Sequence, residues 1–463
     1  MISTVNPATG ESVRHFDAHT PEQTDAILGK AFAAQAQWRE VPMTKRVDLL
    51  RRAAKVLREG SEDYARLITM EMGKPISESR SEIEKCALTM DYYAEHAPAF
   101  LADEAIASNA EESGIVFDPL GVVLAIMPWN YPFWQFFRFA APALAAGNGA
   151  ILKHANNVPQ AALAVQDIFE KAGIPTGLFA TLLIESSQVA GIIADERIAA
   201  VTLTGSTEVG SIVASQAGTA LKKQVLELGG SDPFIVLADA NVAEAAKTAV
   251  RSRFTNAGQS CVNAKRFIVH ESVADEFTDA FISHVQDLVV GNPFDPATTI
   301  GPMARKNLRD ELHGQVRATI DAGATLRLGG KPIPGPGFYY EPTVLDHVVP
   351  GQPAFDEETF GPVAAIIRVA STEDAIRLAN QTEFGLGAAL WTEDRTAAGE
   401  LVRRIDAGAV FVNGMVASDP RLPFGGIKNS GYGRELGSYG IREFTNMKTV
   451  WYGPTVGTEK DAK

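Results

Sequence analysis

The chain has 463 residues, of which 46% are hydrophobic and 21% charged, which is typical of a globular protein with two or three domains. Its net charge of −14 argues against nucleic acid or an anionic membrane surface as a partner. Two cysteines, Cys86 and Cys261, are too few for a disulfide framework, and no Cys/His cluster has metal spacing, so we expect no metal. The N-terminus lacks the regions of a signal peptide and the apolar run 136–152 is interrupted by Arg138, so we expect a cytoplasmic protein.

The first hundred residues predict helices in succession. Thr20 is followed by Pro21 and, three residues beyond the threonine, by Gln23, which is the pattern of a capped helix start. Apolar residues at helical spacing continue through the next segments, and glycines and prolines mark the breaks. Ser61 is the expected cap of the third helix, and Cys86 is expected to pack within the fourth. We predict helices over about 21–38, 44–60, 61–72 and 77–100.

From residue 114 onward, short apolar strands alternate with helices. The first series predicts strands at 114–118, 122–127, 149–153, 178–183, 199–203 and 224–228, and helices at 159–172, 187–194 and 207–219. A second series begins at Phe234, with helices at 242–256 and 273–289 and strands at 267–270, 363–369 and 409–412. This alternation implies parallel βαβ units, an α/β fold class, and ligands at the carboxyl ends of the strands.

The segment 254–261 is the strongest candidate for chemistry. It is small and polar, it ends at Cys261, and Gly258 lets its backbone pass close to another segment. Upstream, Glu227 ends an apolar strand just before two glycines. A thiol and a desolvated carboxylate can serve as nucleophile and base. The alternative is that Cys261 is a small buried packing residue.

Two turns offer groups for an anion. Asn130 lies between Pro128 and Pro132, and a rigidly held amide is what an oxyanion needs. Gly205 and Ser206 connect a strand to a helix N-terminus, which suits a phosphate. A turn asparagine and an ordinary strand–helix turn are the alternatives.

Three further residues suit a nucleotide. Lys153 ends a strand, where a cation can reach ribose or phosphate. Glu358 offers a carboxylate for a sugar hydroxyl, and Phe360 offers a ring for a flat heterocycle. A solvated lysine and a loop corner are the alternatives.

In their order and combination these segments resemble the aldehyde dehydrogenase superfamily. The resemblance covers nearly the whole chain, from Asn6 to Val450. Its motifs are Trp129–Asn130, Lys153, Gly205–Ser206, Glu227–Gly230, Asn256–Cys261, Glu358–Pro362 and Pro423–Gly426.

The resemblance implies a role for each of these residues. Cys261 would attack the aldehyde carbonyl, Asn130 and the Cys261 backbone N–H would hold the oxyanion, and Glu227 would activate the water that hydrolyses the thioester. The cofactor would be held by Lys153 and Glu358 at ribose hydroxyls, Gly205 and Ser206 at the pyrophosphate, Phe360 on the nicotinamide side and Trp129 near the adenine ribose.

Two positions depart from the family pattern. NAD-preferring relatives carry a glutamate three residues after the lysine, where this chain has Asn156. An amide does not repel a 2′-phosphate, so we expect NAD or NADP as cofactor. Glu435 resembles a glutamate linked to proton exit in relatives, but the position of its usual lysine partner holds Phe139.

Arg138 indicates the substrate. If the segment after Asn130 is a helix, Arg138 lies two turns beyond Asn130. Arginine stands at this spacing in aldehyde dehydrogenases that oxidise succinic semialdehyde, and its planar fork matches a carboxylate. The resemblance makes Ser418 a second donor to that carboxylate. Relatives of the human type carry an arginine where this chain has Thr255, and a solvated or interface role is equally open for the nearby arginines, Arg251 and Arg253.

Arg138 can instead be a structural residue at a packing contact. Three alternatives remain open for the activity. The substrate can be glutaric semialdehyde, another carboxylated aldehyde or a broad range of aliphatic aldehydes. A non-redox thiol acyltransferase or hydrolase is the second alternative, and it would need a histidine partner for Cys261 that the matching motifs do not supply. A non-catalytic structural descendant of the family is the third, and the intact set of Cys261, Glu227 and Asn130 disfavours it.

By resemblance, the architecture has two Rossmann-like domains and a small β arm. A cofactor domain would comprise residues 1–100 and 120–230, and a catalytic domain 231–440. Residues 101–119 and 441–456 would form an arm that pairs subunits, giving a homodimer or homotetramer.

Overall fold

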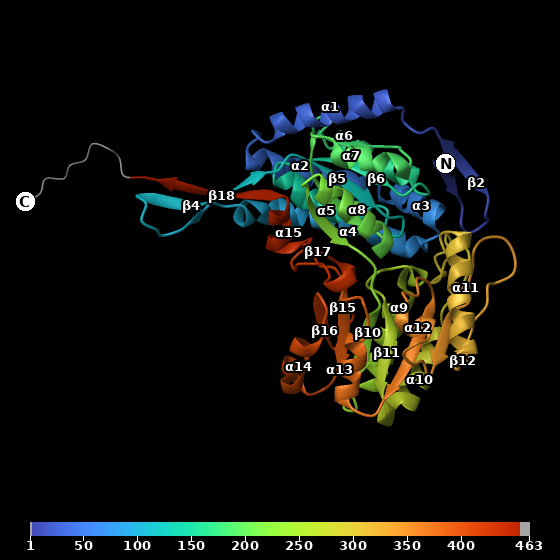
Figure 1. Cartoon of the computed structure of the whole chain (residues 1–463). Coiled ribbons are helices and arrows are strands. Elements are labelled where there is room, and N and C mark those ends of the chain that lie inside the picture. Colours follow the sequence, from blue (N-terminus) through green and yellow to red (C-terminus); the bar gives the residue numbers. More distant parts are fainter. Residues whose placement is uncertain (1, 454–463) are drawn as a thin grey trace, which may run out of the picture.

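The computed structural model describes residues 2–453, and two mainly parallel sheets organise it (Figure 1). The prediction of an α/β fold is confirmed. The first sheet has the order β17-β9-β8-β5-β6-β7, and the second has the order β12-β13-β14-β11-β10-β15-β16. The first comprises β5 (Val122–Met127), β6 (Gly149–His154), β7 (Phe179–Thr181), β8 (Ile198–Thr204), β9 (Lys223–Glu227) and β17 (Gly431–Tyr432).

Helices cover both faces of the first sheet because its strands are apolar on both sides. In β5, Val123, Ala125 and Met127 face one core, and Val122 and Leu124 face the other. The first core is covered by α2 (Met43–Glu59), α3 (Ser61–Met72), α4 (Ile76–Phe100), α5 (Trp134–Ala145) and α6 (Pro159–Lys171). The second is covered by α1 (Pro21–Trp38), α7 (Val189–Ala194) and α8 (Thr207–Thr219).

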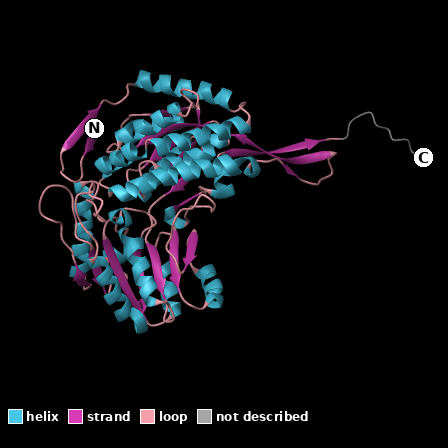
Figure 2. Ribbon diagram, turned by 180° about the vertical axis from the view of Figure 1, so that it is seen from behind, coloured by secondary structure: helices cyan, strands magenta, loops and turns pink. Residues whose placement is uncertain are grey.

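The second sheet is built in the same way (Figures 1 and 2). Its strands are β10 (Asp232–Val236), β11 (Ala264–His270), β12 (Thr325–Leu328), β13 (Thr343–Asp346), β14 (Val363–Val369), β15 (Gly387–Trp391) and β16 (Ala409–Val412). One face packs on α9 (Val242–Phe254) and α10 (Glu271–Gln286). The other packs on α11 (Lys306–Asp321), α12 (Pro353–Asp356), α13 (Thr372–Asn380) and α14 (Arg395–Leu401).

The predicted helices of the first hundred residues are present with small shifts. Thr20 and Gln23 form the predicted capping box of α1. The predicted cap of α3 is wrong, since Gly60 takes that position and Ser61 is the first helical residue. The N-terminal strands β1 (Ile2–Val5) and β2 (Ser12–Phe16), and the later strands β12, β13 and β15, were not predicted. They are short or lack a clear apolar alternation.

A third sheet extends from the body as an arm (Figures 1 and 2). It pairs β18 (Thr445–Tyr452) with β4 (Glu112–Pro119), and β4 with β3 (Glu104–Ala105). Before reaching the arm the chain returns to the first sheet, where β17 pairs with β9 and α15 (Gly437–Glu443) packs against α4. Residues 454–456 of the expected arm lie outside the described residues.

Candidate active site

The candidate site lies between the two sheets. The segments that follow β5, β8 and β9 at the carboxyl edge of the first sheet meet the segments that precede β11 and β14 at the amino edge of the second. A cavity of about 220 Å³ is lined from both sides, with Asn130 and Gly205 from the first sheet and Cys261, Glu358 and Phe360 from the second. Ligand sites are expected at such an edge.

The loop before Cys261 has an unusual backbone. Asn256 and Ala257 have left-handed φ values of 57° and 50°, and Gly258 follows at 72°. A Cβ at Gly258 would lie 2.2 Å from the Gly361 carbonyl oxygen, so the predicted close approach is to the Glu358–Pro362 segment. The Asn256 N–H donates to Glu78 (2.8 Å), which fixes the loop to α4. Only a backbone held on several sides keeps such a conformation.

Cys261 lies where two cavities meet. It lines the 220 Å³ cavity and a second one of about 330 Å³ on the α4 and α5 side. Burial raises the pKa of the Cys261 thiol to about 12, and the cations Arg138 and Lys265 oppose this rise only in part. At neutral pH the free protein therefore holds a thiol, and a base is needed to form the thiolate.

Asn130 is held against the Cys261 loop. Its Nδ2 donates to the Gln259 carbonyl (3.1 Å), while Asn256 Nδ2 donates to the Asn130 carbonyl (2.9 Å). Asn130 lines the same cavity as Cys261, and the second N–H of its Nδ2 is available to a ligand. The amide is thus positioned rigidly, as an oxyanion donor requires.

Glu227 ends β9 and is buried at 2% exposure. Neither carboxylate oxygen has a hydrogen-bond partner, and burial raises its pKa well above the ordinary value. A Cβ at Gly425 would lie 2.6 Å from Glu227 Oε1, so the glycine of the Pro423–Gly426 motif makes room for this side chain. Glu227 does not line either cavity that Cys261 lines, so its side chain must turn to reach a ligand there.

Arg138 lies on α5 and lines the 330 Å³ cavity. Its guanidinium forms an ion pair with Glu435, donates to Thr204 Oγ1 (3.1 Å) and lies over the ring of Phe424. The sequence left Glu435 without its usual partner at Phe139, and the structure places Arg138 in that role. The charge of Arg138 is therefore largely balanced within the protein.

This pairing predicts a stability effect. In Arg138→Met, Glu435 would remain buried without a cation, so the free energy of unfolding should fall by about 3–5 kcal/mol. The double variant Arg138→Met/Glu435→Leu should recover part of that loss, because it leaves neither charge alone. Urea unfolding of the three proteins measures both effects. A single variant as stable as the parent would contradict the pairing.

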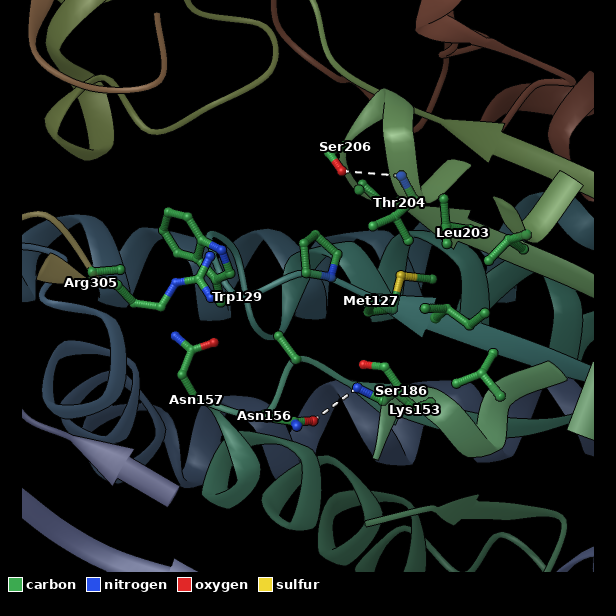
Figure 3. A pocket seen from close by; sticks show the side chains of 18 of the residues that line it. Met127, Trp129, Lys153, Asn156, Asn157, Ser186, Leu203, Thr204, Ser206 and Arg305 are labelled. Carbon is green, nitrogen blue, oxygen red and sulfur yellow. Dashed lines mark hydrogen bonds between the residues drawn. The ribbon is translucent and has the colours of Figure 1, made fainter. Parts of the chain in front are cut away.

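A larger cavity of about 910 Å³ adjoins the first sheet (Figure 3). Lys153 and Asn156 lie along one side, where Lys153 Nζ donates to Asn156 Oδ1 (2.9 Å), and Ser206 lies along the opposite side. Trp129 lies at one end with Arg305 over its ring. The sequence did not predict Arg305, which lies in an irregular stretch before α11.

The turn before α8 is open toward this cavity. The nearest protein atom to a Cβ at Gly205 would be 3.8 Å away, so packing does not require glycine there. Ser206 caps α8 by accepting from the Val209 N–H, and the following N–H groups suit an anion. The cavity size and this turn fit a dinucleotide with its pyrophosphate at Gly205 and Ser206.

Glu358 and Phe360 connect this region to Cys261. Glu358 accepts from the Gly230 N–H (3.0 Å) and lies 3.4 Å from Lys265 Nζ. A Cβ at Gly229 would lie 2.5 Å from Glu358, which explains a glycine there. The ring of Phe360 meets that of Trp129 edge to face at 5.8 Å.

The 330 Å³ cavity also contains Ser418, together with a residue that the sequence did not single out, Lys85. Lys85 Nζ donates to Ser418 Oγ (2.7 Å). The sequence did contain a signal for this group, because Glu78, Glu82 and Lys85 are spaced i, i+4 and i+7 and so lie on one face of the helix. Arg253 is neither solvated nor at an interface, since it is fully buried and donates to the Thr359 carbonyl (2.8 Å).

The fold, and a cysteine where two small cavities meet beside a dinucleotide-sized one, define an aldehyde dehydrogenase. The chain belongs to the aldehyde dehydrogenase family, whose model matches residues 1–450. Two curated relatives align over nearly their full lengths. A Synechocystis protein named a probable succinate-semialdehyde dehydrogenase (NADP+) is 51% identical over 97% of this chain and 99% of its own. A Mycobacterium ulcerans succinate-semialdehyde dehydrogenase (NADP+) is 48% identical over 98% and 100%.

A solved structure agrees with the sequence relatives. The succinic semialdehyde dehydrogenase of Streptococcus pyogenes, solved with NADP+, superposes with a TM-score of 0.96 at 36% identity, over 98% of this chain and 100% of that chain. In the part of the chain that the structure describes, no helix has the length and apolarity to cross a membrane.

Proposed function

We propose that this protein oxidises succinic semialdehyde to succinate with NADP or NAD as the acceptor. One observation carries the proposal: Cys261 lines a small cavity with the cationic residues Lys85 and Arg138 in its wall. On its other side Cys261 lines the cavity that contains Asn130 and Phe360, next to the dinucleotide-sized one. The names of the relatives support the same substrate.

The residues would divide the chemistry as follows. Water in the cavity takes the proton of the Cys261 thiol, the sulfur adds to the aldehyde carbon, and Asn130 Nδ2 and the Cys261 backbone N–H donate to the resulting oxyanion. The nicotinamide, when bound, supplies the acceptor for the hydride. Glu227 then takes a proton from the water that hydrolyses the thioester on Cys261, a role that its raised pKa suits.

Absorbance at 340 nm with purified protein tests the proposal. Succinic semialdehyde, glutaric semialdehyde and butanal are each supplied with NADP and with NAD. We expect reduction of the cofactor, with the highest kcat/KM for succinic semialdehyde. Equal efficiency for butanal would favour a broad aliphatic range, and no reduction with any aldehyde would favour a non-redox thiol enzyme. The residues lining the two cavities at Cys261 include no histidine, which disfavours that last alternative.

Asn156 supports the use of both cofactors. It lies between Lys153 and Glu185, to which its Nδ2 donates (3.0 Å), and it brings no charge of its own. Asn156→Glu should lower kcat/KM for NADP by roughly 100-fold and change it little for NAD, because a carboxylate repels the 2′-phosphate. Asn156→Gln is the matched neutral control. An equal fall in kcat/KM for NADP and NAD in Asn156→Glu would contradict a role of Asn156 in accepting the 2′-phosphate.

The arm and the cysteines support two further proposals. β18 is an edge strand of the arm and exposes Met447, Trp451 and Tyr452, which supports pairing between subunits into a homo-oligomer. The molar mass in solution tests whether the chain forms this homo-oligomer.

Cys86 and Cys261 are unpaired, which supports a reducing, cytoplasmic location. We keep the domain bounds 1–100 with 120–230, and 231–440, as a proposal, although β17 within the last range pairs with β9 of the first sheet.

A further inference from the structure

We infer that Lys85 is the residue that receives the substrate carboxylate and so selects semialdehydes over uncharged aldehydes. The inference rests on the proposed function and identifies its specificity-determining cation. It differs from what the sequence indicated, because Lys85 lies on α4, far along the chain from the motifs around Asn130 and Cys261.

Lys85 is partly buried in the wall of the cavity that contains Cys261. Its ammonium donates to Ser418 Oγ and lies 4.2 Å from the ring centre of Trp134. These two contacts orient the ammonium and use one of its three N–H donors. Within residues 2–453, no Asp or Glu carboxylate forms an ion pair with Lys85, although buried lysines usually have such a partner.

The other charges around the cavity are balanced within the protein. Arg138 pairs with Glu435 and Glu82 pairs with Lys74. Asp419, next to Ser418, pairs with Arg421.

Glu78 is the remaining carboxylate of the wall. It accepts from the Asn256 N–H, and burial raises its pKa to about 7. Below this pKa Glu78 is neutral, so the wall then holds one uncompensated ammonium, which is suited to a single carboxylate.

Ser418 fits the same arrangement. Its hydroxyl accepts from Lys85, so its own hydrogen is free to donate to a second carboxylate oxygen. The sequence proposal for Ser418 is therefore kept, with Lys85 as the charged member of the pair. Arg138 keeps donors that Glu435 and Thr204 do not use, so it can add a further contact to a carboxylate in the same cavity.

The test compares Lys85→Met with the parent enzyme on two four-carbon aldehydes, succinic semialdehyde and butanal. Loss of one charge-assisted contact should lower kcat/KM for succinic semialdehyde by about 10- to 100-fold, mainly through KM. The value for butanal should stay within about threefold, because butanal has no carboxylate. Lys85→Arg, which keeps the charge, should restore part of the loss. Thermal unfolding of each variant shows whether the fold is kept.

A pH experiment on the parent enzyme does not depend on the variant folding. Burial and the neighbouring Arg138 lower the pKa of Lys85 to about 8, against the opposing effects of Cys86, Glu82 and Asp419. Lys85 is charged below this pKa and neutral above it. The ratio of kcat/KM for succinic semialdehyde to that for butanal should therefore fall as pH rises through 8, beyond any fall near pH 7 that comes from ionisation of Glu78 in the same wall, and chemistry common to both aldehydes cancels.

The outcomes separate this inference from the proposed function. A parent enzyme that does not oxidise succinic semialdehyde would refute both. The role of Lys85 alone would be refuted if the parent oxidises succinic semialdehyde but kcat/KM of Lys85→Met falls equally for both aldehydes, or for neither. The role of Lys85 would also be refuted if the ratio of kcat/KM for succinic semialdehyde to that for butanal does not change between pH 7 and 9.

Discussion

Replacement of Cys261 by serine should reduce aldehyde oxidation by about 10⁴- to 10⁶-fold while leaving the fold intact. The thiol lies where the two cavities meet, and a hydroxyl in its place is a far weaker nucleophile at neutral pH. The loop is held through backbone groups by Glu78, Asn130 and Lys265, and not through the Cys261 sulfur. Steady-state rates and thermal unfolding measure the two quantities.

Alkylation of the cofactor-free protein by iodoacetamide gives an independent reading of the same thiol. With a pKa near 12, the thiolate fraction rises by about tenfold per pH unit between pH 7 and 10, and the rate should follow it. The Cys261→Ser variant is the control, because Cys86 is fully buried. A rate that does not change with pH from pH 7 upward would mean that Cys261 is already a thiolate there, which would contradict the raised pKa of this thiol.

The second large effect is expected for Glu227→Gln, which should lower turnover by about 10²- to 10⁴-fold. The amide cannot take a proton from water, so the acyl group should stay on Cys261 after a first, stoichiometric formation of reduced cofactor. Mass spectrometry of the quenched protein should find a succinyl thioester on the peptide that contains Cys261. Glutamine has nearly the same size, so the space beside Gly425 remains filled.

A matched variant at Glu435 distinguishes the role of Glu227 as a base from the general effect of removing a buried negative charge. Glu435→Gln changes a second buried carboxylate of the same cluster, and it should not accumulate the acyl enzyme to the same extent, because Glu435 is paired with Arg138 whereas both carboxylate oxygens of Glu227 have no hydrogen-bond partner. If Glu227→Gln turned over at the parental rate, or if no acyl group were found on Cys261, another group would have to activate the water.

The fold class followed from local patterns. Apolar runs such as Val122–Met127 and Gly149–His154 are buried on both faces, and this pattern identifies strands of a parallel sheet. The helix start at Thr20 was equally local, since a capping box needs only neighbouring residues. Strands such as Thr325–Leu328 were missed because pairing with distant partners, and not their own sequence, makes them strands.

The family resemblance identified the motif residues, but it did not place their partners. Arg138 was expected to face a substrate carboxylate, and its pairing with Glu435 became visible only when residues nearly three hundred positions apart were brought together. Lys85 was overlooked for the same reason. Its neighbours in the chain describe an ordinary amphipathic helix, whereas its neighbours in space are Ser418 and Trp134.

The sequence by itself determined the α/β architecture and the kinds of chemical group available, because periodicity, capping and short motifs depend on residues close together in the chain. Only the tertiary structure decided which charges are balanced and which remain for a ligand. Coulomb interactions and desolvation depend on distance in space and on burial, and neither can be read from positions along a chain.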